Sequence, residues 1–353
     1  MSEVLSAGKA AFISRRRRSL FIILSVLLLI LFTLDIFLGS VKIAPHDIMN
    51  AIFNGSGGDI ATIVLRFRIP KALTALFVGI ALSLSGLQMQ TVFRNPMAGP
   101  YVLGVSSGAS LGVAIVILGF SSRVAPANLH GLGNWLIVLS AWSGAGIVML
   151  LIMMISSRVR DIMTILIIGI MLAGGISAIV SILQYFSNET FLKSYVIWTM
   201  GSLGNLSSSQ LQVLIITVAG GVLLGIMSIK MLDAMLLGEN YASSIGLNIT
   251  TSRIVIFSCT SILAGSVTAF CGPIGFIGIA VPHIARRLFR TSGHAILIPG
   301  TILTGGAVLL LSDIVSQMPG SDKILPLNSI TSLIGIPVVL WVILRNKKET
   351  GSF

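Results

Sequence analysis

The sequence predicts an all-α integral membrane protein with about ten transmembrane helices. Of its 353 residues, 55% are hydrophobic and only 10% are charged, and the mean hydropathy is +1.00. A soluble domain carries about a quarter charged residues. Apolar runs of roughly 20 residues, long enough to cross a bilayer as a helix, recur along the whole chain. We therefore expect one multi-pass transmembrane domain with short loops.

Each expected span is an apolar run bounded by charged residues, Gly or Pro. The predicted spans lie at 19–40, 70–93, 100–120, 134–156, 162–186, 206–229, 254–271, 274–290, 294–312 and 327–344. Several are rich in Gly and Ser, which is typical of helices that pack on one another in a membrane. Gly272-Pro273 breaks the helix between the seventh and eighth spans. A transmembrane domain at 19–344 is thus expected between a basic segment at 1–18 and a tail at 345–353.

The first span begins like a secretory signal, with the basic run Arg15–Arg18 before apolar residues. The apolar run is long and no small-residue cleavage site follows it, so we expect a retained first helix.

The distribution of basic residues predicts the orientation. With an even number of spans, sixteen of the 23 Lys and Arg residues fall in the loops on one side and seven in the loops on the other. The positive-inside rule then places both termini and the loop at 230–253 in the cytoplasm. A weak inverted repeat relates spans two to five with spans seven to ten, because small-residue runs there lead into Asn95-Pro96 and Val281-Pro282.

The loop at 230–253 is predicted to be structured. Gly238 can end one short helix, and Glu239 suits the first turn of the next. Ala242 and Gly246 are four residues apart and should leave one helical face nearly free of side chains, where another protein can approach closely. The alternative is an ordinary connector resting on the lipid surface.

Several functional classes are disfavoured. Asp35 and Asp313 lie late in predicted spans, where capping or local pairing is favoured over proton transport, so an ion-coupled secondary transporter is the alternative and not the leading hypothesis. The chain has no phosphate-binding loop motif, and its scattered histidines have no metal-ligand spacing, so we expect no enzyme and no metal site. The basic residues that give the net charge of +12 lie at span ends and form no basic stripe, which argues against binding of nucleic acid.

Some polar residues are expected to be structural. Gln88 and Gln90 are predicted to bond neighbouring helices, and His283 to make a structural hydrogen bond. Cys259 and Cys271 are interpreted as small buried hydrophobic residues.

An ordered set of motifs identifies a family resemblance. The segments are Arg68-Ile69-Pro70-Lys71, Gly79–Gln90, Arg94–Pro100, Leu103–Ala109, Trp198–Leu203, the loop at 237–247, Gly272–Gly278 and Val281–Arg286. In this order, over about residues 60–340, they resemble the membrane subunits of ATP-driven importers for iron–siderophores, haem and vitamin B12.

The resemblance implies an assembly. The chain would be one half of a homodimer in a bacterial cytoplasmic (inner) membrane, with no cofactor of its own. Two cytoplasmic ATPase subunits, which bind the ATP and Mg, would dock on the loop, and an external or periplasmic binding protein would deliver the chelate. The implied coupling residues are Leu237, Gly238, Glu239, Asn240, Ala242, Ser243, Gly246 and Leu247, and Arg68 and Lys71 match positions that dock the binding protein.

Two segments depart from the family pattern. The family has Ala-Asp-x-x-Ala-Arg at the end of the ninth span, but the matching segment here has Gln317 in place of the Arg. One outer docking contact is therefore expected to be weaker unless Lys323 replaces it. The family's Glu-Leu-Pro-Val-Gly begins here with Ile324.

The fifth span is the candidate lining of the translocation path. Its small or weakly polar residues are Gly169, Gly174, Gly175, Ser177, Ser181 and Gln184. They would let a bulky complex slide without being trapped, or they simply pack helices. An iron–siderophore is the expected cargo as the commonest case, with haem and vitamin B12 left open.

Overall fold

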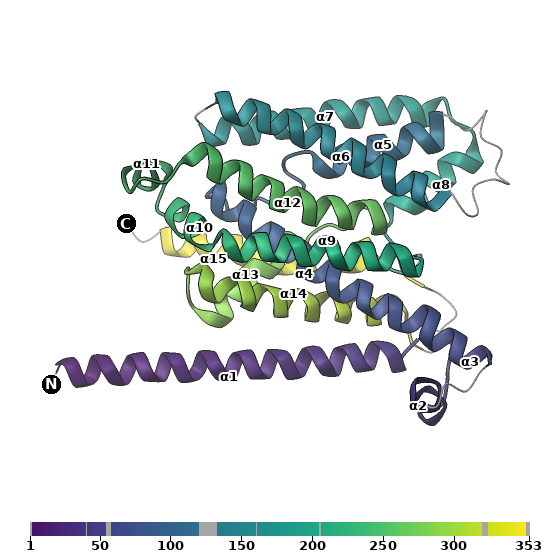
Figure 1. The fold of residues 1–353 in the computed structure, drawn as a ribbon, viewed down its shortest axis with the longest axis horizontal. Coiled ribbons are helices and arrows are strands. Elements are labelled where there is room, and N and C mark those ends of the chain that lie inside the picture. The colour runs from purple at the N-terminus through teal and green to yellow at the C-terminus, as the bar shows by residue number, and fades with distance from the viewer. Residues whose placement is uncertain are drawn as a thin grey trace.

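The computed structural model describes residues 2–39, 41–53, 58–119, 133–159, 161–204, 206–319 and 324–350, and across these ranges it is helical without a strand. Ten helices overlap the predicted spans: α1 (Ser2–Phe37), α4 (Ile69–Val92), α5 (Val105–Ala114), α6 (Gly133–Arg158), α7 (Ile162–Tyr185), α9 (Ser208–Met227), α12 (Ile249–Cys271), α13 (Ile277–Phe289), α14 (His294–Ser316) and α15 (Leu327–Thr350). They run roughly along the long axis of one bundle (Figure 1). The predicted all-α fold is confirmed.

The described helices include seven segments that are long and apolar enough to cross a membrane: Arg15–Phe37, Asp59–Val92, Trp135–Arg158, Ile162–Tyr185, Ser208–Met227, Ile249–Cys271 and His294–Ser316. Two other predicted spans form shorter apolar helices, Val105–Gly119 and Leu327–Trp341. The remaining one is α13, with 13 residues. At about 1.5 Å per residue, α13 is shorter than the roughly 30 Å hydrocarbon core. A count of ten crossings and the inverted repeat therefore stay predictions.

Two of these three short helices, α5 and α13, begin late because glycine and proline residues precede them. Turns occupy the chain around Pro96 and Pro100, and α5 starts only after Gly104, which has a φ of 76°. The helix then ends in a π-helical segment, η2 (Ile115–Gly119). Before α13, Gly272 has a φ of 76° and Phe276 a φ of 66°. Residues 272–276 are therefore not helical, which corrects the predicted start at 274.

Two glycines, Gly79 and Gly86, allow α4 to cross two helices closely. A Cβ on Gly86 would lie 1.8 Å from the carbonyl oxygen of Gly278 on α13. A Cβ on Gly79 would lie 2.3 Å from that of Gly305 on α14. Backbone contact replaces side-chain contact at these crossings, so α4 becomes the central, almost fully buried helix.

Polar residues in the core bond across helices, as predicted. The side-chain amide of Gln88 donates to Cys259 Sγ at 3.2 Å and accepts from Thr260 Oγ1 at 3.1 Å. Gln90 Nε2 donates to the carbonyl oxygen of Ile279 at 3.0 Å. The ring of His283 lies 2.8 Å from the carbonyl oxygen of Pro96. Both cysteines are buried and free.

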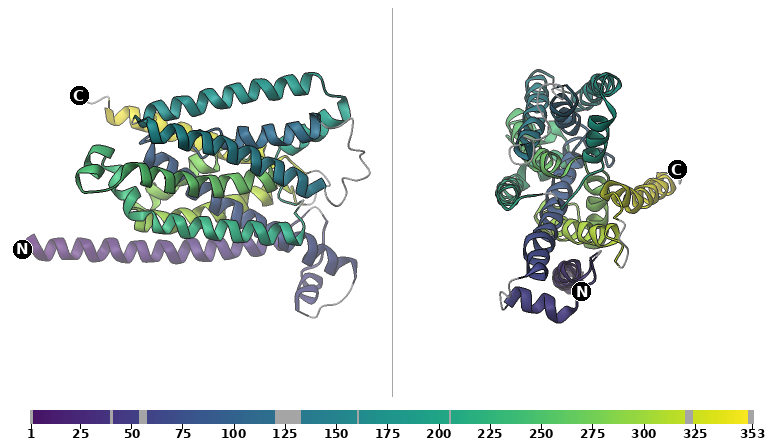
Figure 2. Two further views of the ribbon diagram at one scale, coloured as in Figure 1. Left: turned by 45° about the horizontal axis from the view of Figure 1, so that its top comes forward. Right: turned by 90° about the vertical axis from the view of Figure 1, so that its right-hand side faces the viewer.

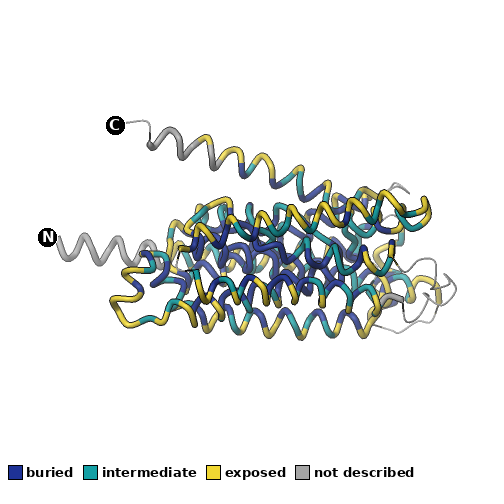
Figure 3. The backbone as a smooth tube through the Cα atoms, turned by 90° about the horizontal axis from the view of Figure 1, so that it is seen from above, coloured by how far each residue is buried: buried dark blue, intermediate teal, exposed yellow. Residues whose placement is uncertain are grey.

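Short helices gather at the two ends of the bundle. The N-terminal end of α1, the C-terminal end of α15, α10 (Ile229–Leu236) and α11 (Glu239–Ser244) lie at one end (Figure 1). The other end carries α2 (Pro45–Phe53), α3 (Asp59–Thr62) and α8 (Glu189–Thr199). We call these the terminal end and the α8 end. The helix α15 diverges from the bundle (Figures 2 and 3), and its outward side is exposed.

Candidate functional site

The loop at 230–253 forms two short helices that are joined by a turn. α10 ends at Leu236, and Gly238 then adopts a φ of 110° as the residue before α11. That backbone region favours glycine. Glu239 lies in the first turn of α11. The predicted helix–Gly–helix arrangement is therefore confirmed, and the loop is not an irregular connector.

The expected face of small residues on α11 does not exist. Ala242 is fully buried, because its side of the helix packs inward. The helix ends at Ser244, and Gly246 follows it with a φ of 87° and open space around it. The two residues thus do not share an exposed helical face, and this part of the prediction is wrong.

An apolar surface takes its place. Leu237, Tyr241 and Ile245 are 62%, 49% and 58% exposed. Tyr241 and Ile245 are one turn apart, within and at the end of α11, and Leu237 lies just before Gly238 at the end of α10. We call these three residues the coupling patch. Of them, the sequence had singled out only Leu237, although the four-residue spacing of large apolar residues was visible in the polar loop. Exposed apolar clusters of this kind mark sites where proteins bind.

A buried ion pair fixes α11 to the bundle. The Arg253 guanidinium on α12 donates to both carboxylate oxygens of Glu239, at 2.9 and 2.7 Å. The same side chain, which is 3% exposed, donates to the carbonyl oxygen of Val159 just beyond α6. Two-pronged arginine–carboxylate pairs of this type have a fixed geometry. Arg253 therefore connects α11 to α12 and to the end of α6 through directional hydrogen bonds.

A second contact ties α10 to α14. Asp233 accepts the backbone N–H of His294 at 2.9 Å, at the first residue of α14. The ring nitrogen Nδ1 of His294 lies 2.6 Å from the same carboxylate oxygen, and its Nε2 lies 2.8 Å from Thr91 Oγ1 on α4. The short helices are thus attached to α4, α12 and α14 by directional bonds.

The start of α7 is also capped at this end. Asp161 accepts from Met163 N at 3.3 Å and from Thr164 N and Oγ1 at 2.9 and 2.6 Å. These hydrogen bonds to Thr164 hold the pKa of the exposed Asp161 carboxyl below its usual value. The ionised carboxylate complements the positive end of the helix dipole.

At the α8 end, Arg68 is not presented to a partner. It is 8% exposed and donates from Nη1 to the carbonyl oxygens of Ile36 and Phe37, at 2.9 and 3.0 Å. Its other amino group bonds the carbonyl oxygen of Val41. Arg68 therefore caps the carbonyl end of α1, and this geometry opposes the docking role implied for it. The exposed cation nearby is Arg66, in the π-helical segment η1 (Ile63–Arg68).

Lys71 belongs to a buried polar cluster. Its Nζ lies 3.0 Å from Asp313 Oδ1. The Gln317 amide donates to Asp313 Oδ2 at 3.0 Å and to Asp35 Oδ1 at 2.9 Å. Both aspartates are 2% exposed, so they pair locally as predicted. Gln317 is therefore a core residue here, and Lys323 falls outside the described residues.

The residues proposed for the path on α7 separate into two groups. Gly169 is buried, since a Cβ there would lie 2.8 Å from the carbonyl oxygen of Val102, so it serves packing. Gly174 and Gly175 are exposed with open space around them. Ser177, Ser181 and Gln184 line a cavity of about 230 Å³ between α5, α7 and α8. The sequence did not indicate the serines of α5 that form its other wall.

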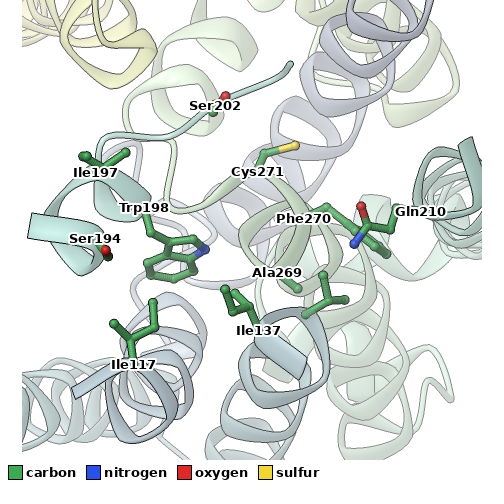
Figure 4. A pocket seen from close by; sticks show the side chains of 11 residues that line it. Ile117, Ile137, Ser194, Ile197, Trp198, Ser202, Gln210, Ala269, Phe270 and Cys271 are labelled. Carbon is green, nitrogen blue, oxygen red and sulfur yellow. The ribbon is translucent and has the colours of Figure 1, made fainter. Parts of the chain in front are cut away.

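A second cavity, of about 240 Å³, lies behind α8 (Figure 4). Its lining is mainly apolar and includes Ile117, Ile137 and Phe270, with the indole of Trp198 projecting into it. Phe270 also meets the ring of Trp142 edge-on at a centroid distance of 5.4 Å. The cavity lies between α8, η2 and the residues at the ends of α6 and α12.

Comparison with protein families decides the relationship. The family model described as the FecCD transport family matches residues 27–345. The chain belongs to the FecCD transport family. Relatives of this FecCD member include the vitamin B12 import system permease protein BtuC of Escherichia coli O9:H4, 34% identical over 327 residues that cover 92% of this chain and 94% of the relative. BtuC of E. coli O127:H6 is also 34% identical, over 91% of this chain and 94% of its own.

Solved structures agree with the FecCD assignment. A transporter of metal-chelate ABC type in an inward-facing conformation has a TM-score of 0.78 and 27% identity, covering 94% of this chain and 99% of that one. PsaBC from Streptococcus pneumoniae, solved with a Fab, has a TM-score of 0.50 at 13% identity, covering 84% of this chain and 94% of its own, and shows likeness of fold alone. The resemblance found in the sequence is confirmed: this FecCD protein is a permease subunit of the ABC importer class.

Proposed function

We propose that the chain is one half of a homodimeric importer that carries a metal chelate into the cytoplasm, driven by two separate ATPase subunits. The observation that carries this proposal is the coupling patch: three exposed apolar side chains on and just before α11, a short helix that Glu239 and Arg253 attach to the bundle. A rigid, exposed apolar surface of this kind can bind in a groove of a soluble partner that moves it. It lies at the terminal end, which the charge distribution assigns to the cytoplasm.

The exposed side of α7 supports a second copy. Ser177 and Ser181 are exposed on α7, a helix long and apolar enough to cross a membrane. Small and weakly polar residues are enriched where membrane helices pack on one another. A second copy packed on this face would cover these serines, and a homodimer would place two such faces around one path.

The opposite end would receive the external binding protein. Exposed basic residues there are Lys42, Arg66 and Lys193. Such charges mainly orient and accelerate docking. Arg66 is proposed in place of Arg68 for this role, and the relatives named as vitamin B12 permeases keep cobalamin beside iron–siderophores as a candidate cargo.

The test is a charge placed in the coupling patch. In cells that carry the full transporter, Tyr241→Asp should abolish uptake and co-purification of the ATPase, because burial of a central aromatic residue commonly supplies 2 kcal/mol or more, about thirtyfold in affinity. Thr250→Asp, exposed in the first turn of α12 and outside both the patch and the implied coupling residues, should retain both. Uptake by the purified subunit alone, driven by an ion gradient, would contradict the proposal and favour an ion-coupled carrier.

A further inference from the structure

A run of four arginines, Arg15–Arg18, begins the apolar segment of α1 at the terminal end of the bundle (Figure 1). Three of them are exposed, and Arg17 is half-buried. None of the ion pairs among the described residues includes any of the four. Basic residues at the ends of spans serve in general to orient a membrane protein. A binding site here therefore needs an observation beyond their number.

That observation is the environment of Arg17. It lies on the packed side of α1, because Phe21 and the buried Leu24 follow it at helical spacing. The ring of Phe21 packs against that of Phe289 on α13, with centroids 4.6 Å apart. The Nε–H of Arg17 is buried and has no hydrogen-bond partner among the described residues. Buried donors are almost always bonded to protein, ordered water or an ion, so this donor calls for an acceptor.

The end of α13 brings another cation to the same place. Arg290 directly follows Phe289 and is the residue at which α13 ends. The start of α1 and the end of α13 both belong to the terminal end, where α14 begins four residues later with its bond to α10. Arg17 and Arg290 therefore lie beyond the same aromatic contact, one by a helical turn and the other by a single residue.

The other arginines of α13 are already engaged. Arg286 donates to the side-chain oxygen of Gln90, and the guanidinium of Arg287 lies 4.3 Å from the ring centroid of Trp341. The side chain of Arg290 is exposed and has no partner in the described part of the chain. It is thus available to an anion.

An exposed apolar stripe continues from these cations along α1. Ile22, Val26 and Leu29 are 58%, 49% and 63% exposed, and their spacing from Arg18 keeps all four residues on one side of the helix. A cationic end that continues into apolar surface matches a molecule with an anionic head and apolar tails. Arginine binds phosphate oxygens through two parallel hydrogen bonds. In a membrane, the molecule with this chemistry is a phospholipid.

We infer that Arg17, Arg18 and Arg290 bind the headgroup phosphate of an anionic phospholipid whose acyl chains lie along the exposed stripe of α1. The phosphate supplies the acceptor for Arg17 and joins α1 to the end of α13. An anionic lipid is favoured over a zwitterionic one, because no described carboxylate pairs with these arginines and could receive a choline ammonium group. The site concerns the membrane and is independent of the cargo.

The experiment measures binding to the whole chain purified in detergent. The probes are phosphatidylglycerol, phosphatidylcholine with the same acyl chains, and inorganic phosphate. Native mass spectrometry counts bound lipid, and thermal unfolding measures stabilisation by each probe. Phosphatidylglycerol should bind at least tenfold more tightly than phosphatidylcholine and should raise the melting temperature. Inorganic phosphate at the same concentration should leave the melting temperature unchanged.

Variants locate the site. Arg17→Gln, Arg18→Gln and Arg290→Gln should each weaken binding of phosphatidylglycerol about fivefold, the contribution of one basic residue near a membrane surface. Arg18 and Arg290 are exposed, so their variants keep the test valid if Arg17→Gln does not fold. The control is Arg158→Gln, which removes an exposed cation at the end of α6 and should bind as wild type does.

Three results would overturn the inference. Equal affinity for the two lipids would show that the headgroup charge is not recognised. An equal loss of affinity in the control and the site variants would show diffuse attraction to the basic end of the protein. Equal stabilisation by inorganic phosphate would assign the cations to a free anion and not to a lipid.

Discussion

Arg253 holds Glu239 through two hydrogen bonds, at 2.9 and 2.7 Å, and so joins the short helix α11 to the long helix α12. Arg253 also donates to the carbonyl oxygen of Val159, which lies between α6 and α7. One buried side chain thus connects α11 with the segment that precedes α7, the helix that borders the serine-lined cavity. We expect force applied to α11 to reach α7 by this route, because each of these contacts is directional.

Arg253→Met is expected to uncouple the transporter. The change leaves the partly exposed Glu239 carboxylate without its cation, and loss of hydrogen bonds to a charged group costs about 1.5–3 kcal/mol. Uptake should fall by more than tenfold, while ATP hydrolysis by the assembled complex loses its dependence on cargo. Uptake and ATPase rates measured on the same membranes check this. Arg158→Met removes an exposed arginine close by and should change neither. If the two variants behave alike, the relay through Arg253 is wrong.

Much of the fold follows from the sequence because hydrophobic length and glycine spacing are local signals. The all-α membrane class and the turn at Gly238 are confirmed. Starts of α5 and α13 were misplaced, because hydropathy remains high where Gly and Pro have already broken the helix. The count of spans depends on three short apolar helices, α5, α13 and α15.

The candidate site was less predictable because side-chain direction depends on tertiary packing. Ala242 is small enough for either side of α11, and only contact with the bundle turns it inward. Arg68 reads as an outer cation, yet the uncapped carbonyls at the end of α1 lie within its reach. The serines of α5 and α7 are about 70 residues apart in sequence, so no local pattern could join them.

Gly86→Ala is expected to prevent folding. Even a single methyl group there would lie 1.8 Å from the Gly278 carbonyl oxygen, and backbone cannot move aside without separating α4 from α13. The yield of monodisperse protein in detergent should drop to background. Gly220→Ala on α9 is the matched control, since its Cβ meets nothing within 4 Å. That variant should be neutral or stabilised by about 0.4–1 kcal/mol through helix propensity. Normal yield of Gly86→Ala would show that the crossing is looser than described.

Gln317 is expected to stabilise the α8 end in place of the arginine that the family pattern has there. Its amide donates to both Asp35 and Asp313, which are each 2% exposed. Lys71 places one amine beside this acid pair, in contact with Asp313. Gln317→Leu removes both donors and should cost about 1–3 kcal/mol for each carboxylate oxygen left without one. Gln317→Arg keeps donors to both carboxylates and adds a positive charge between them, so it should melt at or above the wild-type temperature. Thermal unfolding of the two variants in the same detergent measures the difference. A leucine variant as stable as wild type would mean that Lys71 and water already satisfy the acid pair, and that Gln317 is replaceable by any residue of its size.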